Sequence, residues 1–207
     1  MDAESKRYGV LSSREKEVKV RKLMVSEFVS LDGVMEAPGG EEGYRHTGWT
    51  IEFHDPGQME YKLDEVLEAG ALLLGRVTYE GFAAAWPSYS DEAGFADKMN
   101  GMPKHVASTT LQALEWNNST VIEGDVAEGV AALKREEDGD LLVAGSRTLV
   151  HTLIEHDLVD EYRLMIFPVV LGSGGRLFPE RQEKLVLKLV GSKSFDSGVV
   201  VQTYHPA

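Results

Sequence analysis

Two segments of this chain share one order of patterns: a short apolar run, a glycine, and then a helix-forming stretch. Residues 71–74 (ALLL) lead into Gly75, and residues 141–144 (LLVA) lead into Gly145. A continuous apolar run of this length is typical of a strand that is buried on both faces, as in a parallel sheet. Strands that alternate with helices in this way predict a doubly wound α/β fold.

The other predicted elements fit the same plan until the C-terminal part of the chain. Further strands are predicted at 23–29, 104–107 and 120–122, and helices at 57–69, from 76, from 125 and from 146. The last three predicted strands have no helix between them: 161–170, 185–194 and 199–205. We therefore expect one domain over residues 21–207, with a mostly parallel sheet and an antiparallel C-terminal edge. Residues 1–20 are polar without apolar periodicity and are expected to be an N-terminal extension.

Composition excludes several classes of function. The 207 residues include 34 acidic and 21 basic side chains, a net charge of −13, which argues against nucleic acid or an anionic membrane as partner. The absence of cysteine excludes disulfides, thiolate metal sites and a cysteine nucleophile. No segment has the length of a membrane span or the apolar core of a secretory signal, so a soluble, cytoplasmic protein is expected. The histidines and acids show no metal-ligand spacing, and no metal is expected.

The two glycine junctions are the first candidate ligand site. In open α/β sheets ligands bind beyond the carboxyl ends of the strands, where glycine allows close approach and free helix amides favour an anion. The first junction adds Arg76 and Thr78, and the second adds Ser146, Arg147 and Thr148, with Ser146 as predicted helix N-cap. Two anion-binding sites of this kind fit a ligand with two separated phosphate groups, such as NADPH. The spacing alone leaves open that the glycines only allow tight helix–strand packing.

Two further polar features follow predicted strands. Ser108 and Thr109 come directly after the strand at 104–107, where they would reach the ligand edge or cap a turn. Asp32 follows the first strand within Ser-Leu-Asp-Gly. An Asp-Gly pair is common in turns. The other interpretation is a carboxylate at the ligand edge that orients substrate or relays a proton.

Several segments together resemble the dihydrofolate-reductase-like family. They occur in the family's order: SEFVSLDG at 26–33, LGRVTYE at 74–80, KHVAST at 104–109, VAGS at 143–146, and the segment from DEY at 160 to GGRLFP at 174–179. The branch that they resemble most is the C-terminal reductase domain of the bifunctional riboflavin-biosynthesis deaminase-reductase. The resemblance extends from about Lys22 to the C-terminus.

The resemblance implies an NADPH-dependent oxidoreductase. It implies that residues 75, 76 and 78 lie beside the cofactor phosphates, 108–109 at the adenosine end and 145–147 around the pyrophosphate. Asp32 and the loop around Met35 would border the nicotinamide and the substrate. The implied reaction is hydride transfer to a C=N bond or masked carbonyl of a pyrimidine ribosylamine or a pterin. A binding protein of the same fold without turnover is the alternative.

The sequence departs from the folate enzymes in one respect that concerns mechanism. Those enzymes carry an acid early in their first long helix, and here Asp55, Glu60 and Asp64 are all candidates. Three aromatic residues are candidates for pocket walls or for the core: Trp49, Phe53 and Trp86. Relatives in the reductase branch are commonly dimers, so a homodimer is expected, with the C-terminal strands as a possible pairing edge.

Overall fold

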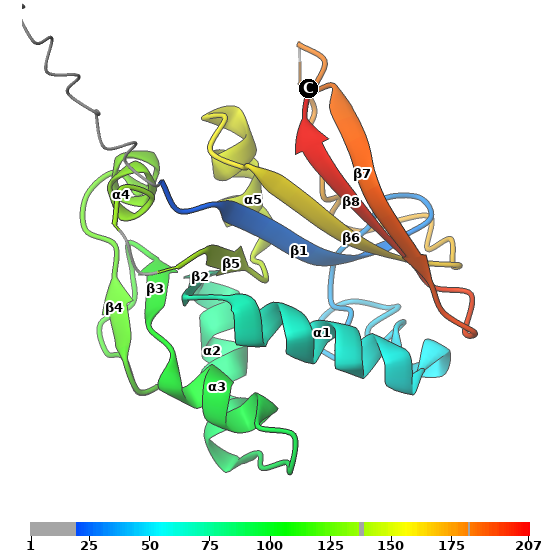
Figure 1. The fold of residues 1–207 in the computed structure, drawn as a ribbon, viewed down its shortest axis with the longest axis horizontal. Helices are drawn as coiled ribbons and strands as arrows, with labels where there is room; N and C mark the ends of the chain where they lie inside the picture. Colours follow the sequence, from blue (N-terminus) through cyan, green and yellow to red (C-terminus); the bar gives the residue numbers. More distant parts are fainter. Residues whose placement is uncertain (1–19, 137–138, 182) are drawn as a thin grey trace, which may run out of the picture.

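The computed structural model describes residues 20–136, 139–181 and 183–207, and within them one mixed sheet organises the chain (Figure 1). Its strands are β1 (Leu23–Ser30), β2 (Ala71–Gly75), β3 (Lys104–Ala107), β4 (Ser119–Val121), β5 (Leu141–Val143), β6 (Glu161–Phe167), β7 (Leu187–Ser194) and β8 (Val200–Pro206). Their order across the sheet is β4-β3-β2-β5-β1-β6-β8-β7. The predicted extension lies outside the described residues, except for Val20.

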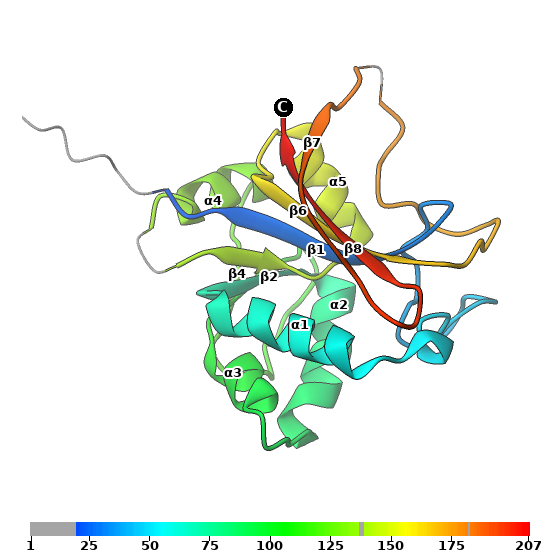
Figure 2. The same cartoon turned by 45° about the vertical axis from the view of Figure 1, so that its right-hand side comes forward.

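Helices cover both faces of the sheet, as the alternating pattern predicts (Figure 2). The helices are α1 (Pro56–Glu68), α2 (Arg76–Ala85), α3 (Phe95–Gly101), α4 (Val126–Leu133) and α5 (Arg147–Glu155), with 3-10 turns η1 (Ile51–Phe53) and η2 (Trp86–Ser88). Apolar residues of β1 alternate between two cores. Leu23 and Val25 pack on the side of α4 and α5, whereas Met24 packs on the side of α1, α2 and α3.

The C-terminal edge is antiparallel as predicted, but it begins one strand later. β6 was expected to belong to that edge, yet it pairs parallel with β1, and only β8 and β7 run antiparallel. The reason is that α5 lies between β5 and β6, so the chain crosses over the sheet and returns in the same direction. Helix α3 was not predicted; it is short and begins after Gly94, which has φ 85°.

The side chains at two predicted helix starts, Asp125 and Ser146, bond differently. The Asp125 side chain accepts a hydrogen bond from the Glu128 amide at 2.9 Å, so it caps α4, which begins where a helix was predicted. Ser146 occupies the N-cap position of α5, but its hydroxyl makes no capping hydrogen bond. The prediction of its bonding was wrong, because the Ser146 side chain lies against Gly75 instead.

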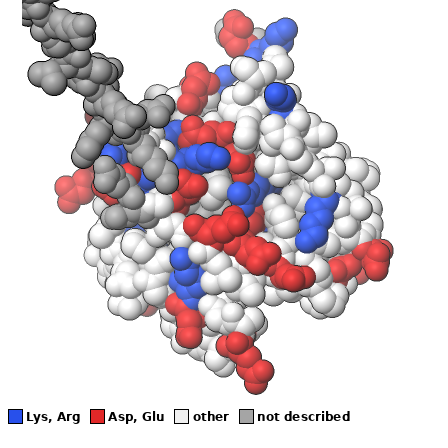
Figure 3. All heavy atoms as spheres, in the orientation of Figure 1, with Lys and Arg blue, Asp and Glu red and all other residues white. Residues whose placement is uncertain are grey.

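Acidic side chains run across the face that α1 covers, with some basic ones between them (Figure 3). This distribution means that an anionic ligand must find a local site against the net charge of −13. Among the residues that the structure describes, no helix has both the length and the apolar character needed to cross a membrane.

The buried side chain of Lys104 joins three segments on the α3 side of the sheet. The residue is 0% exposed, and its Nζ donates hydrogen bonds to the carbonyls of Asn100 at 2.9 Å, Met102 at 2.8 Å and Asn117 at 3.0 Å. Nζ also lies 4.3 Å from the centroid of the Trp116 ring. The ammonium therefore satisfies carbonyls at the end of α3 and before β4.

We predict that Lys104→Met lowers the free energy of unfolding by roughly 2–4 kcal/mol, because one buried and two partly buried carbonyls lose their donor. Urea unfolding followed by circular dichroism measures the change. Lys184→Met is the matched control, because Lys184 is exposed in the loop before β7, and it should change stability by about 0.5 kcal/mol or less. Equal effects of the two substitutions would contradict the assigned role of Lys104.

Candidate functional site

The structure brings the two glycine junctions into contact. The backbone amide of Gly75 donates a hydrogen bond to the Gly145 carbonyl at 3.2 Å. Beside this contact lies a cavity of about 270 Å³, which we call the strand-end groove. It is bordered by the carboxyl ends of β2 and β3, by the start of α2 and by α5. Six of the predicted cofactor-binding residues line it: Gly75, Arg76, Ser108, Thr109, Ser146 and Thr148.

Glycine is required at both junctions. A Cβ on Gly75 would overlap the Ser146 hydroxyl and lie 3.0 Å from the Ser146 backbone nitrogen. Gly145 has φ 88°, and a Cβ there would lie 2.7 Å from Thr78 Oγ1. Close packing and an open approach for a ligand therefore occur at the same place, so the two interpretations of the glycines do not exclude each other.

The predicted cofactor-binding residues differ in where their side chains lie and in what they contact. Thr78 lies beneath Gly145 and Arg147 lies against Gly175, and neither side chain borders the groove. Arg76 Nη1 forms an exposed ion pair with Glu80 at 2.8 Å. Ser108 Oγ accepts the Leu111 amide at 2.9 Å, so it caps a turn while it also lines the groove.

Asp32 holds a turn. Its carboxylate accepts hydrogen bonds from the Ser30 hydroxyl at 2.7 Å, the Leu171 amide at 3.1 Å and the Gly172 amide at 2.8 Å. The Ser30 hydrogen bond and the two amides lower the pKa of Asp32 to about 2. A carboxylate with this pKa is ionised at neutral pH and is a poor proton donor. The geometry favours the turn interpretation of Asp32 over the catalytic one.

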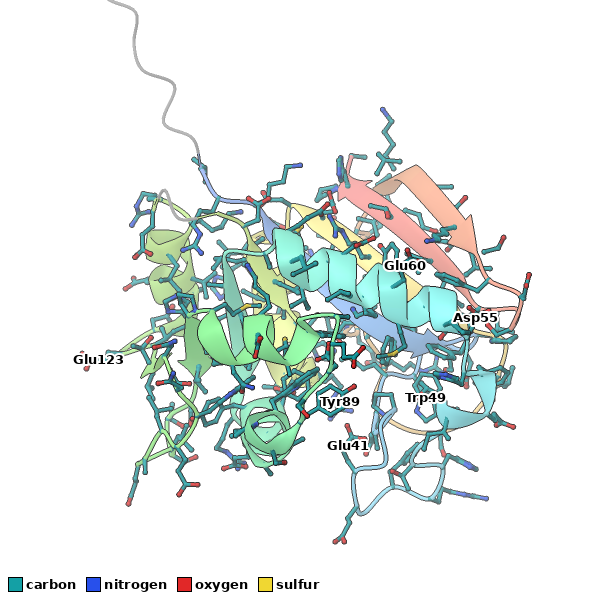
Figure 4. The ribbon with its side chains drawn as sticks, turned by 60° about the horizontal axis from the view of Figure 1, so that its bottom comes forward. Glu41, Trp49, Asp55, Glu60, Tyr89 and Glu123 are labelled. Carbon is teal, nitrogen blue, oxygen red and sulfur yellow. The ribbon has the colours of Figure 1, made fainter. Side chains whose placement is uncertain are left out.

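The candidate acids of α1 do not converge on a site. Asp55 accepts the Gly57 amide at 2.8 Å and caps the helix, and Glu60 lies along its exposed side (Figure 4). Asp64 is also exposed. The buried acid of α1 is Glu65, which was not among the predicted candidates although it directly follows Asp64.

Glu65 is part of a buried ionic cluster between α1 and the sheet. The Ser26 hydroxyl lies 2.9 and 3.0 Å from its two oxygens, and Lys62 Nζ lies 2.5 Å from Oε2. Lys62 Nζ also donates to Ser26 Oγ at 2.7 Å, and the guanidinium of Arg163 lies 3.7 Å from Glu65 Oε1. The cations compensate the buried carboxylate, so this cluster holds α1 on β1 and β6.

A second buried acid that the sequence analysis missed is Glu27 on the central strand β1. Its side chain is 8% exposed, and Oε1 has no hydrogen-bond partner within the described structure. Burial raises the pKa of Glu27 to about 8, although nearby Lys62 and the Gly145 amide act in the opposite direction. An acidic residue among the apolar residues of a predicted buried strand was the signal that could have identified it.

The three aromatic candidates belong to the apolar packing. Trp49 is buried, donates from Nε1 to the Glu36 carbonyl at 2.9 Å, and meets the Phe167 ring at 5.3 Å. Phe53 packs on the same Phe167 ring, and Trp86 packs on Phe95 at 5.0 Å. None of the three lines the strand-end groove.

The sheet order, the antiparallel C-terminal strands and the groove at the strand ends define a protein of the dihydrofolate-reductase-like class. Residues 21–201 match the family described as the RibD C-terminal domain, and the chain belongs to that family. This membership confirms the family resemblance and a reductase-like function of the riboflavin or dihydrofolate reductase type.

Individual relatives agree with this assignment. The uncharacterized protein YyaP of Bacillus subtilis is 31% identical over 191 residues, which cover 91% of this chain and 96% of YyaP. A putative riboflavin biosynthesis protein from Shewanella sp. PV-4 superposes with a TM-score of 0.71 at 20% identity, covering 90% of this chain and 99% of that one. Dihydrofolate reductase from Enterococcus faecalis, solved with NADP(H), superposes with a TM-score of 0.58 at 17% identity. The match covers 89% of this chain and 96% of that one. At these identities the solved structures define the fold alone.

We predict that Asp32→Asn lowers the melting temperature at neutral pH, because an amide is a weaker acceptor for the two backbone N–H groups. The folded-state pKa is lowered, so the stabilisation is complete above the unfolded value of 3.8 and is lost as pH falls towards about 2. Urea unfolding of both proteins from pH 7 to pH 2 measures the difference. A stability gap that stays constant down to pH 2 would contradict the role of the ionised carboxylate.

Proposed function

We propose that this protein is an NADPH-dependent reductase. Hydride would pass to the carbon of a C=N bond or masked carbonyl in a pyrimidine ribosylamine, such as 5-amino-6-(5-phosphoribosylamino)uracil, or in a pterin. The observation that carries the proposal is the strand-end groove, where a glycine, several hydroxyls and the starts of α2 and α5 meet. Membership in the RibD C-terminal domain family supports the ribosylamine as the first substrate to test.

The residues of the groove fit the phosphate groups of a dinucleotide. The helices α2 and α5 direct unpaired backbone amides at their starts towards an anion, and Gly75 leaves the backbone accessible. Arg76 is held only by an exposed ion pair with Glu80, which contributes little and can be exchanged for a phosphate. Ser108 and Thr109 offer hydroxyls for the ribose or phosphate oxygens.

In this proposal the chain positions the reactants. Bound NADPH would supply the hydride from its nicotinamide ring. The groove residues bind the phosphates, the close contact of Gly75 with Gly145 and Ser146 sets the depth of the groove, and the packed strand ends limit access of water. One observation favours the alternative of a binding protein without turnover: Asp32, the acid first expected to move a proton, is committed to a turn.

We predict that the wild-type protein binds NADPH more tightly than NADH, and that Arg76→Gln removes most of this preference. Loss of one charge-assisted contact should weaken NADPH binding by about 10- to 100-fold. The affinity for NADH should change by about threefold or less. Isothermal titration calorimetry measures both affinities. Lys188→Gln on the distant edge strand β7 is the control and should change neither. Absence of NADPH binding to the wild type would refute the proposal.

Turnover distinguishes the reductase from the binding protein. The wild-type protein would be incubated with NADPH and either freshly prepared ribosylamine or dihydrofolate, and oxidation of NADPH would be followed by absorbance. We expect oxidation with one of them. Tight NADPH binding without oxidation in the presence of either compound would favour the alternative.

We also propose a homodimer that pairs through the C-terminal strands. β7 is an edge strand, and it exposes Leu189 and Val190, while Val186 is exposed just before it. Sedimentation equilibrium should give a mass about twice 22.8 kDa, and Leu189→Lys should shift it towards the monomer. A monomeric wild type would contradict the proposal.

A further inference from the structure

The position of Glu27 relative to the glycine junctions is set by the strand register. Leu73 and Val25 both pair with Val143, so two residues further along Gly75, Gly145 and Glu27 occupy one row across β2, β5 and β1. Ala107 of β3 extends the row on the other side of Gly75. Since Ala107 and Gly75 line the strand-end groove, Glu27 stands in the same row, two strands beyond Gly75.

The Glu27 side chain also lies on the face that carries the groove. Side chains alternate along a strand, and Val25 and Val29 both pack into the core beside α5. Glu27 lies between them in the alternation and therefore projects to the α5 face. The groove is bordered on this face by Ser146, Leu149 and Thr152 of the α5 segment. The carboxyl group thus lies beside Gly145, directly before the start of α5.

The bonding of Glu27 is incomplete. Oε1 is buried and has no hydrogen-bond partner within the described structure, which is unusual for a polar atom and calls for an explanation. Glu65 shows the contrast, because its buried carboxylate contacts Ser26, Lys62 and Arg163. A ligand that extends from the groove past Gly145 would bring a polar atom within reach of the unpaired oxygen.

The surroundings hold Glu27 in its neutral form. Burial raises its pKa to about 8, Lys62 and the Gly145 amide lower the pKa, and Glu65 raises it. Lys62 and Glu65 are paired with each other on α1, across the sheet. The charged group at the start of α5 is Arg147, whose guanidinium lies against Gly175. The Glu36 carboxylate is also engaged there, because it accepts the Gly175 amide at 2.5 Å. A neutral carboxyl group carries a hydrogen that it can donate.

We propose that Glu27 is the proton donor of the reduction, an inference that rests on the proposed reductase function. As the substrate carbon gains the hydride, the nitrogen of the C=N bond (or the oxygen of the carbonyl) forms a bond to the Glu27 hydrogen. The Glu27 O–H bond breaks and leaves a carboxylate, NADPH is oxidised to NADP⁺, and the substrate is reduced by two electrons and two hydrogens. The carboxylate then regains a proton from solvent.

The other acids around the site are unsuited to this role. Asp32 is ionised and holds a turn, Asp55 caps α1, and both Glu65 oxygens are taken up by contacts with Ser26, Lys62 and Arg163 on the α1 face. Glu27 combines a place in the row of the groove, burial and an unpaired oxygen. This combination distinguishes a proton donor from an acid that only supports the fold.

The test compares wild type with Glu27→Gln, which keeps the shape and removes the transferable proton. We expect NADPH affinity within about threefold of wild type and kcat lower by about 100-fold or more. Wild-type kcat should fall as pH rises above about 8, and the residual activity of Glu27→Gln should not show this decline. Glu123→Gln is the matched control, because Glu123 is exposed beyond β4 (Figure 4), and it should behave as wild type.

A second measurement does not depend on turnover. Carbon-13 NMR of glutamate carboxyl groups in the free protein should show one resonance that titrates near pH 8 and is missing from Glu27→Gln. If every glutamate resonance titrates below about pH 5, the proposal is overturned. Should Glu27→Gln fail to fold, Glu27→Asp retains an acid with a shorter reach, and it should lower kcat while keeping a decline of kcat at alkaline pH.

The outcomes separate this proposal from the proposed function. Wild type that neither binds nor oxidises NADPH overturns the reductase function and this proposal together. Wild type that oxidises NADPH, with Glu27→Gln equally active, overturns the role of Glu27 and leaves the reductase function standing.

Discussion

The close contact between the two glycine junctions is the constraint on which the rest of the site depends. Gly75 donates its amide to the Gly145 carbonyl, and no side chain fits between Gly75 and Ser146. This contact brings the starts of α2 and α5 to the same edge of the sheet. The groove with its hydroxyls and unpaired amides follows from it.

An anion-binding groove of this kind must act locally, because the protein as a whole repels anions. The net charge is −13, and acidic side chains run across the α1 face. Backbone amides and hydroxyls attract a phosphate at short range without adding buried positive charge. Arg76 is the charged residue of the groove, and its exposed pair with Glu80 leaves it available to a ligand.

The central strand β1 separates two polar environments. Ser26 faces α1, where Lys62 and Glu65 form a compensated ionic cluster. Glu27, the next residue, projects to the opposite face without such compensation. Adjacent residues of one strand thus have opposite surroundings: Ser26 hydrogen-bonds the Glu65 side chain on the α1 face, whereas burial on the other face raises the pKa of Glu27 to about 8.

The sequence by itself determined the alternation of strands and helices, the two glycine junctions and the family, because apolar periodicity and turn residues act over a few neighbours. Only the tertiary structure decided the direction of β6, the commitment of Asp32 to a turn and the place of Glu27 in the row of the groove. These depend on crossovers and on strand register. Both join residues that are more than a hundred positions apart, such as Glu27 and Gly145, and no local pattern records which side chains will meet there.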